Sequence, residues 1–333
     1  MNGDKLVWVA PAPHVKHNDN SRTIMLDVVI AMVPALVWAV YMFGFRVLSV
    51  LAVSVASSVI FEFLFQKILR RPVTVLDFSA VVTGMLIAFN LPASVSLWVP
   101  VMGSFFAIVI VKQLFGGIGK NVVNPALAAR VFLFTAWPSE IGGYVEPLSE
   151  KLSPLTVNAG DIVASATPLA SLKLGETPDV SIFDLFIGNM PGCIGEVSAL
   201  LILIGGIYLL LRRVITWHIP VSFLGTVAVL CFLFPQTQSV QAYEFMFMEL
   251  FSGGLMLGAV FMATDYATSP VTSSGRVIYG IGCGAITVFI RYFGGYSEGV
   301  SFAILIMNLL VWYIDKATRP KPFGYIPKKK EVK

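Results

Sequence analysis

Residues 24–45, with the sequence IMLDVVIAMVPALVWAVYMFGF, and residues 47–66, with the sequence VLSVLAVSVASSVIFEFLFQ, decide the fold class. Each stretch is almost wholly apolar and holds a single acidic residue, Asp27 in the first and Glu62 in the second. An α-helix needs about 20 such residues to cross the hydrocarbon core of a bilayer. The two stretches therefore predict two successive membrane-spanning helices, separated only by Arg46.

The composition of the whole chain agrees with this interpretation. Of its 333 residues, 56% are hydrophobic and only 13% are charged, and the mean hydropathy is +0.81. Water-soluble domains carry about 25% charged residues, so this chain lacks the polar surface that such a domain needs. The net charge is only +4. Lys and Arg gather at the ends of apolar stretches, which argues against a nucleic-acid partner and leaves membrane lipid as the expected surrounding.

Further apolar stretches follow along the chain, at residues 75–91, 95–113, 122–137, 191–211, 214–235, 243–263, 276–293 and 299–315. The stretches 75–91 and 122–137 are short, which is typical of tilted or broken helices inside a bundle. We therefore expect an all-α polytopic membrane protein with about ten transmembrane helices.

The distribution of Lys and Arg predicts the orientation, because cytoplasmic loops of membrane proteins are enriched in both. Only four basic residues fall on the opposite side: Arg46, Lys151, Lys173 and Arg291. We expect a multi-pass protein of the bacterial inner membrane with both termini in the cytoplasm. Residues 1–23 then form a polar cytoplasmic arm rather than a signal peptide, and residues 316–333 form a basic cytoplasmic tail.

Residues 138–190 form a long extracytoplasmic loop rich in Pro, Ser, Glu and Asp. This loop divides the spans into a first half, 24–137, and a second half, 191–315, with five helices each. An odd number of helices in each half places the halves in opposite orientations, as in inverted-repeat transporters. The pairs Phe78-Ser79 and Phe251-Ser252 occupy similar places in the two halves.

Cysteine and histidine usage restricts the cofactors that the chain can hold. Cys193, Cys231 and Cys283 lie far apart, whereas an iron–sulfur cluster usually needs four thiolates. Only three histidines are present, which leaves no pair on facing helices for a bis-histidine haem. We predict no metal site and no catalytic residue in this chain. A redox cofactor would need another chemistry of attachment.

The extracytoplasmic loop contains the sequence DIVASATPL at residues 161–169. One interpretation is a turn of small residues in which Ser165 or Thr167 caps a helix. The other is that the Thr167 hydroxyl is esterified to the phosphate of FMN. That linkage needs an accessible hydroxyl, small neighbours and an extracytoplasmic location, and all three are expected here.

This segment resembles the flavin attachment site of one known family. In subunits of Rnf complexes and of sodium-pumping NADH:quinone reductases, the site looks like Asp, two or three variable residues, a small residue, Ala and Thr. Asp161, Ser165, Ala166 and Thr167 match this pattern. Ile162 and Ala164 depart from it, because Gly and a hydroxyl residue are common there.

Other segments resemble the RnfD and NqrB family in the same order along the chain. They are APHV at 12–15, SRTIM at 21–25, KQLFGGIGKN at 112–121, NPA at 124–126, GAVFMATD at 258–265 and PKPFG at 320–324. The length of this chain, 333 residues, is more similar to that of RnfD chains than to that of the longer NqrB chains. The resemblance implies covalent FMN on Thr167, a second, non-covalent riboflavin, and partner subunits of the A, B, C, E and G type.

Three polar residues are candidates for contacts with the second flavin. Asn121 and Asn124 follow a glycine-rich segment, where the backbone can approach a planar ligand closely. The alternative is a turn whose asparagines bond their own backbone. Asp265 lies beside Thr264 and Thr268, so its oxygens suit either a hard cation or a flavin.

Two classes of function remain open from the sequence. The first is a membrane subunit of an Rnf-type complex that couples electron transfer between ferredoxin and NAD to the translocation of Na⁺ or H⁺. In this role the chain is the electron-carrying subunit of an oxidoreductase and is not active alone. The second is a solute transporter or channel with inverted repeats and no flavin. A covalent flavin distinguishes the two.

Overall fold

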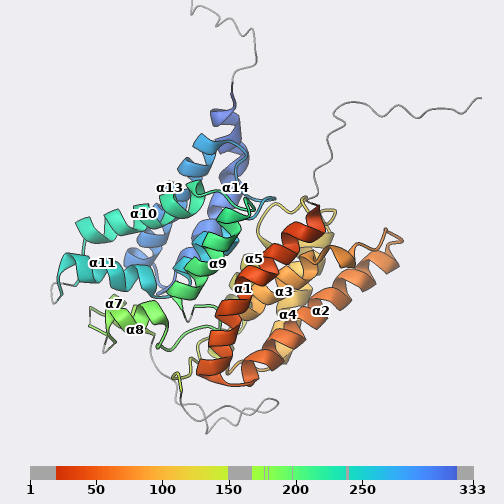
Figure 1. The fold of residues 1–333 in the computed structure, drawn as a ribbon. Helices are drawn as coiled ribbons and strands as arrows, with labels where there is room; N and C mark the ends of the chain where they lie inside the picture. The colour runs from red at the N-terminus through yellow and green to blue at the C-terminus, as the bar shows by residue number, and fades with distance from the viewer. Residues whose placement is uncertain are drawn as a thin grey trace, which may run out of the picture.

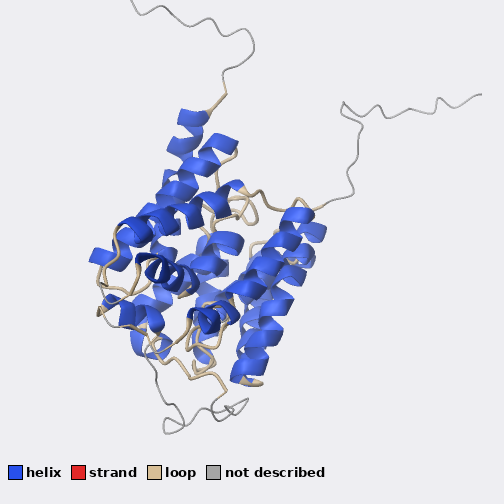
Figure 2. Ribbon diagram, turned by 60° about the vertical axis from the view of Figure 1, so that its left-hand side comes forward, coloured by secondary structure: helices blue, strands red, loops and turns tan. Residues whose placement is uncertain are grey.

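The computed structural model describes residues 20–148, 167–175, 177–178, 180–196, 198–237 and 240–320. Within these ranges the chain consists of helices and connections, without a strand (Figure 2). The sequence prediction of an all-α polytopic membrane protein is confirmed. Helix starts follow ordinary capping chemistry: Asn20 and Thr23 form a reciprocal capping box at the first helix.

The helices of the first predicted half are α1 (Ser21–Phe43), α2 (Arg46–Ile68), η1 (Val75–Asp77), α3 (Ser79–Phe89), α4 (Trp98–Phe105), η2 (Phe106–Gln113) and α5 (Pro125–Ala136). The predicted loop contains α6 (Pro138–Ile141), α7 (Pro168–Lys173) and α8 (Ile182–Ile187). The second half contains α9 (Ala199–Leu211), α10 (His218–Leu233), α11 (Ala242–Phe251), α12 (Leu255–Leu257), η3 (Gly258–Met262), α13 (Ser273–Phe293) and α14 (Val300–Thr318).

Among the described residues, four helices are long and apolar enough to cross a membrane alone: α1, α2, α13 and α14. The predicted span 243–263 is a broken helix, because α11 and the α12–η3 segment meet at an angle of 65°. Gly253 allows this break with a backbone φ of +69°. The remaining predicted spans are apolar helices of 10–17 residues, so a total of ten crossings stays a prediction.

The predicted span 191–211 begins later than expected. Its helix, α9, starts only at Ala199, after the N-cap Ser198. Residues 191–196 form a connection instead, since Pro191, Gly192 and Gly195 disfavour a helix. In place of helical hydrogen bonds, the backbone N–H of Gly195 donates to the carbonyl of Phe89 at the end of α3, and that of Ile194 donates to the carbonyl of Leu91 just after it.

The first helices of the two halves run side by side in opposite directions (Figure 1). Asp27, near the start of α1, accepts a hydrogen bond from the Tyr208 hydroxyl at 2.8 Å and pairs with Arg212 at 3.2 Å. Both partners lie at the end of α9. The last helices of the two halves, α5 and α14, are also antiparallel. Asn124 at the start of α5 lies near Asn308 midway along α14, whereas Arg130, further along α5, contacts Glu298 just before α14.

The Phe-Ser pairs occupy related positions in this arrangement. Ser79 begins α3, and its hydroxyl accepts a hydrogen bond from Lys112 Nζ at 2.7 Å. Ser252 ends α11, three residues before α12 begins, and its carbonyl accepts a hydrogen bond from Arg291 Nη2 at 3.2 Å. In each half the basic residue comes from the next span along the chain. This agrees with two halves of opposite orientation, whose boundaries remain a prediction.

The basic residues on the sparsely charged side contact other parts of the protein. Arg46 donates to the carbonyl of Val95 at 2.9 Å. Lys173 donates to the carbonyls of Gly294 and Tyr296, and Arg291 pairs with Glu249 at 2.6 Å. Lys151 lies outside the described residues. The three described exceptions to the charge asymmetry are therefore structural contacts.

We predict that Gly205→Val separates α1 from α9. A Cβ at Gly205 would lie 2.3 Å from the carbonyl oxygen of Ala31, so the α1 backbone must move. Overpacking of this kind costs about 1–3 kcal/mol. The matched control is Gly225→Val in α10, where a Cβ meets no atom within 4 Å. Thermal unfolding in detergent should show a clearly lower melting temperature for Gly205→Val and an unchanged one for Gly225→Val. Equal melting temperatures would contradict this packing.

Candidate functional site

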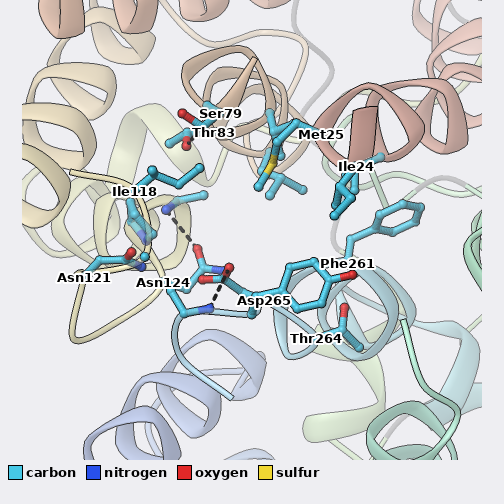
Figure 3. A pocket seen from close by; sticks show the side chains of 18 of the residues that line it. Ile24, Met25, Ser79, Thr83, Ile118, Asn121, Asn124, Phe261, Thr264 and Asp265 are labelled. Carbon is cyan, nitrogen blue, oxygen red and sulfur yellow. Dashed lines mark hydrogen bonds between the residues drawn. The ribbon is translucent and has the colours of Figure 1, made fainter. Parts of the chain in front are cut away.

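A cavity of about 360 Å³ lies between the two halves, where α1 begins and α9 ends. Its walls come from α1, α3, η2, the start of α5, the end of α9 and the connection after η3 (Figure 3). Small-molecule sites in proteins are typically about 300–1,000 Å³. The cavity therefore has the size of a ligand site.

The three predicted contact residues Asn121, Asn124 and Asp265 all line this cavity. In Figure 3 they lie on one side of the space, across from Ser79 and Thr83. The structure thus brings together residues that are up to 144 positions apart in the chain. Whether they contact a flavin stays a prediction.

The asparagines also bond the local backbone, as the alternative interpretation expected. Asn124 caps α5, because its Oδ1 accepts from the backbone N–H groups of Ala126 and Leu127. Its Nδ2 donates to the carbonyl of Met262 at 3.1 Å and so ties α5 to η3. Asn121 donates to the carbonyl of Val123. These bonds give the cavity wall a defined geometry.

Asp265 lies in the connection between η3 and α13. Its carboxylate accepts a hydrogen bond from the Thr268 hydroxyl at 3.1 Å and one from the Ala267 N–H at 3.5 Å. Burial raises the pKa of Asp265 above its ordinary value. The hydrogen bonds from Ala267 and Thr268 and the positive charge of Lys112 lower the pKa, but their effect is smaller. The half-buried carboxylate is thus held by hydrogen bonds on the cavity wall.

Lys112 and Glu62 form a buried ion pair beside the cavity. The Nζ of Lys112 lies 2.7 Å from Glu62 Oε2, and the two side chains are 4% and 1% exposed. Gln113 and Gln66 donate to the other carboxylate oxygen at 3.0 and 3.3 Å. The distribution of basic residues predicts Lys112 among the cytoplasmic charges, whereas the structure places its side chain inside the bundle.

A second buried group of charges lies deeper along α5. We define the Arg130 cluster as Arg130, Glu196, Glu298 and Asn90. Arg130 Nη2 lies 3.0 Å from Glu196 Oε1 and also pairs with Glu298. Its Nη1 donates to Asn90 Oδ1 at 2.7 Å. Sequence reasoning missed this cluster, although a lone arginine within the apolar stretch 122–137 was a signal for it.

Thr167 lies next to the Arg130 cluster. It is the N-cap of α7, and its hydroxyl oxygen accepts from the Ala170 N–H at 3.3 Å. Together with Glu196, Glu298 and Tyr144 it lines a pocket of about 20 Å³. That pocket is too small for a flavin ring, so a ring attached to Thr167 must lie outside it. Asp161, Ser165 and Ala166 lie outside the described residues.

Polar contacts connect the Arg130 cluster with the cavity. Asn90 accepts from Arg130 and donates to the Met262 sulfur at 3.8 Å, and the carbonyl of Met262 accepts from Asn124 on the cavity wall. Asn124 and Arg130 are separated along α5 by six residues, or about 9 Å at 1.5 Å per residue. The two candidate sites are therefore neighbours along one helix.

Comparison with known proteins agrees with the sequence resemblance. The model of the "NQR2, RnfD, RnfE family" matches residues 8–324. The chain is 48% identical to the D-type component of the Na(+)-translocating ferredoxin:NAD(+) oxidoreductase complex of Acetobacterium woodii, over 98% of each chain. It is 37% identical to the D-type component of the proton-translocating complex of Clostridium ljungdahlii, over 95% of this chain and 96% of that protein. The corresponding component of the ion-translocating oxidoreductase complex of Stutzerimonas stutzeri is 40% identical, over 90% of this chain and 91% of that protein.

We predict that Lys112→Met strongly destabilises the protein, because it leaves the Glu62 carboxylate buried without its cation. Breaking a buried ion pair in this way costs about 3–5 kcal/mol. The double variant Lys112→Met with Glu62→Gln should recover most of the loss. The control is Lys120→Met, which changes an exposed lysine. Melting curves of the purified protein test this cycle. A Lys112→Met protein that melts like Lys120→Met would show that the pair is not buried.

Proposed function

The chain belongs to the NQR2, RnfD, RnfE family, and we propose that it is the D-type membrane component of an ion-translocating ferredoxin:NAD oxidoreductase complex. The observation that carries the proposal is the match to the Acetobacterium woodii protein over nearly the full length of both chains. Its partners are the other subunits of the complex, of the A, B, C, E and G type. The chain is an oxidoreductase subunit that contributes electron transfer rather than a complete active site.

In this role Thr167 carries FMN through a phosphoester. The support is the resemblance of residues 161–169 to flavin attachment sites, together with the position of Thr167 at the start of α7. In the helix cap the Thr167 oxygen accepts a hydrogen bond from the Ala170 N–H, and an ester at this oxygen is compatible with that role. Lys173, at the end of α7, fastens this helix to the carbonyls of Gly294 and Tyr296.

The cavity of about 360 Å³ holds the second, non-covalent flavin, riboflavin. Its wall combines two kinds of group that suit an isoalloxazine ring. Apolar side chains such as Ile24, Met25 and Phe261 face the space, and Asn121 and Asp265 offer hydrogen-bonding groups. A flavin supplies the redox chemistry when bound, while these residues orient the ring and keep water from it.

The location of the two sites gives the chain its role in energy conversion. Thr167 lies near Glu298, which precedes α14, whereas the cavity lies at the start of α1 and the end of α9. With both termini in the cytoplasm, the Thr167 site faces outward and the cavity faces inward. Each electron that moves between them against 100 mV exchanges about 2.3 kcal/mol with the membrane potential.

A transporter without flavin remains the second candidate. The broken helix α11 with α12–η3 and the cavity between two opposed halves are features that such transporters share. The covalent flavin separates the two functions, because a solute transporter carries none.

We predict that Thr167→Ala abolishes the flavin fluorescence of the denatured chain in a gel. The matched control is Ser181→Ala, which removes a comparable N-cap from α8. Loss of a cap costs about 1 kcal/mol in either variant, so both should insert into the membrane. Peptide mass spectrometry should find FMN on Thr167 and not on Ser165. A fluorescent Thr167→Ala band would refute the attachment site.

We predict that acid precipitation of the purified complex releases riboflavin while FMN stays with this chain. Asp265→Asn should slow reoxidation of the Thr167 flavin more than its reduction, because electrons pass from the Thr167 flavin to the flavin in the cavity. Stopped-flow absorbance measures both rates. Absence of extractable riboflavin together with normal turnover of Asp265→Asn would place the second relay in another subunit.

A further inference from the structure

The Arg130 cluster contains two carboxylates and one guanidinium group. Glu196 and Glu298 both lie within ion-pair distance of Arg130 Nη2. Arg130 and Glu196 are less than 10% exposed, and the Glu298 side chain is 19% exposed. The second oxygen of Glu298 accepts the backbone N–H of Gly254 at 2.6 Å, which holds this carboxylate in place.

Among the described residues, the basic side chains near the cluster are held by other partners. Arg291 of α13 approaches Gly253 and is paired with Glu249 of α11 at 2.6 Å, and Lys173 of α7 donates to the carbonyls of Gly294 and Tyr296. Tyr144 and Cys193 also face the cluster and are neutral at physiological pH. If both glutamates were ionised, the described part of the cluster would carry a net charge of −1. A buried unpaired charge is unfavourable, and a proton on one carboxylate removes it.

The carboxylates are placed to exchange such a proton with water. Glu196 and Glu298 both line the small pocket beside Thr167, and Glu298 and Arg130 line a second pocket next to it. Both glutamates lie in connections that precede a helix, rather than within one. Burial and the neighbouring charge of Glu298 raise the pKa of Glu196 to about 7, against the opposing effect of Arg130.

We propose that Glu196 and Glu298 form a proton-binding site that takes up one proton when the flavin on Thr167 gains an electron. The proposal rests on the proposed function of Thr167. A reduced flavin or iron–sulfur group of a neighbouring subunit supplies the electron, and a hydronium ion supplies the proton. The O–H bond forms on a carboxylate oxygen, and hydronium becomes water. The added negative charge favours proton binding on a nearby carboxylate.

When the electron leaves toward the cavity, the proton returns to water. The charge near Thr167 then stays constant through each transfer. Arg130 acts as the positioning residue, because it holds both carboxylates and, through Asn90, contacts the polar path to the cavity.

The test is a redox titration of the Thr167 flavin in the purified complex between pH 5.5 and 8.5. In the native protein the midpoint potential should fall as pH rises through neutrality, because reduction takes up a proton. A flavin also binds protons of its own on reduction, so in Glu196→Gln, and in Glu298→Gln as a second variant, the fall should become less steep rather than vanish. The control is Glu244→Gln in α11, outside the cluster, which should titrate like the native protein. A dependence of the midpoint potential on pH that is as steep in both glutamine variants as in the native protein would overturn the proposal.

A second readout does not need the flavin. In the Thr167→Ala complex, infrared difference spectra between acid and alkaline pH should show a carboxylic acid C=O band that titrates near neutrality and disappears with Glu196→Gln. If Thr167 carries no flavin, this band persists, and the redox link fails together with the proposed function. If Thr167 carries flavin but the band is absent, the proton site alone is refuted.

Discussion

Charges inside a lipid-surrounded bundle are tolerated only when they are paired, and the rest of this structure depends on how three basic residues meet that condition. Lys112, Arg130 and Arg291 each lie inside the protein, and each has a carboxylate within 3.0 Å. Breaking such a pair is costly. Each pair therefore fixes the position of the two segments that carry its residues relative to each other. The pairs also determine where polar groups lie inside the protein.

Two of these three basic residues contact opposite ends of one short helix, α3. Lys112 contacts the start of α3 at Ser79, and Arg130 contacts its end at Asn90. Both contacts lie inside the protein, since Ser79 and Asn90 are buried at the two ends of this helix of 11 residues. The cavity lies beside the first contact and Thr167 beside the second. One short helix thus links the two candidate sites.

The sequence predicted the features that depend on local composition, and it missed those that depend on long-range pairing. The apolar stretches, the short third and fifth spans and the polar cavity residues Asn121 and Asn124 follow from runs of neighbouring residues or from the family resemblance. Arg130 meets Glu196 and Glu298 across 66 and 168 positions, and no pattern in one sequence marks such a meeting. The break at Gly253 was hidden for a related reason, since an isolated glycine pair within an apolar stretch is compatible with a continuous membrane helix.

The central claim is that the Thr167 site and the cavity open to opposite sides of the membrane. Two exposed positions test it directly: Leu174 after α7 and Val271 in the connection that follows the cavity, which are 77% and 78% exposed. The native cysteines in the described structure, Cys193, Cys231 and Cys283, are buried and give a low background. A membrane-impermeant maleimide added outside should label Leu174→Cys in intact cells and should label Val271→Cys only after permeabilisation. Labelling of Val271→Cys from outside, with Leu174→Cys protected, would contradict the account.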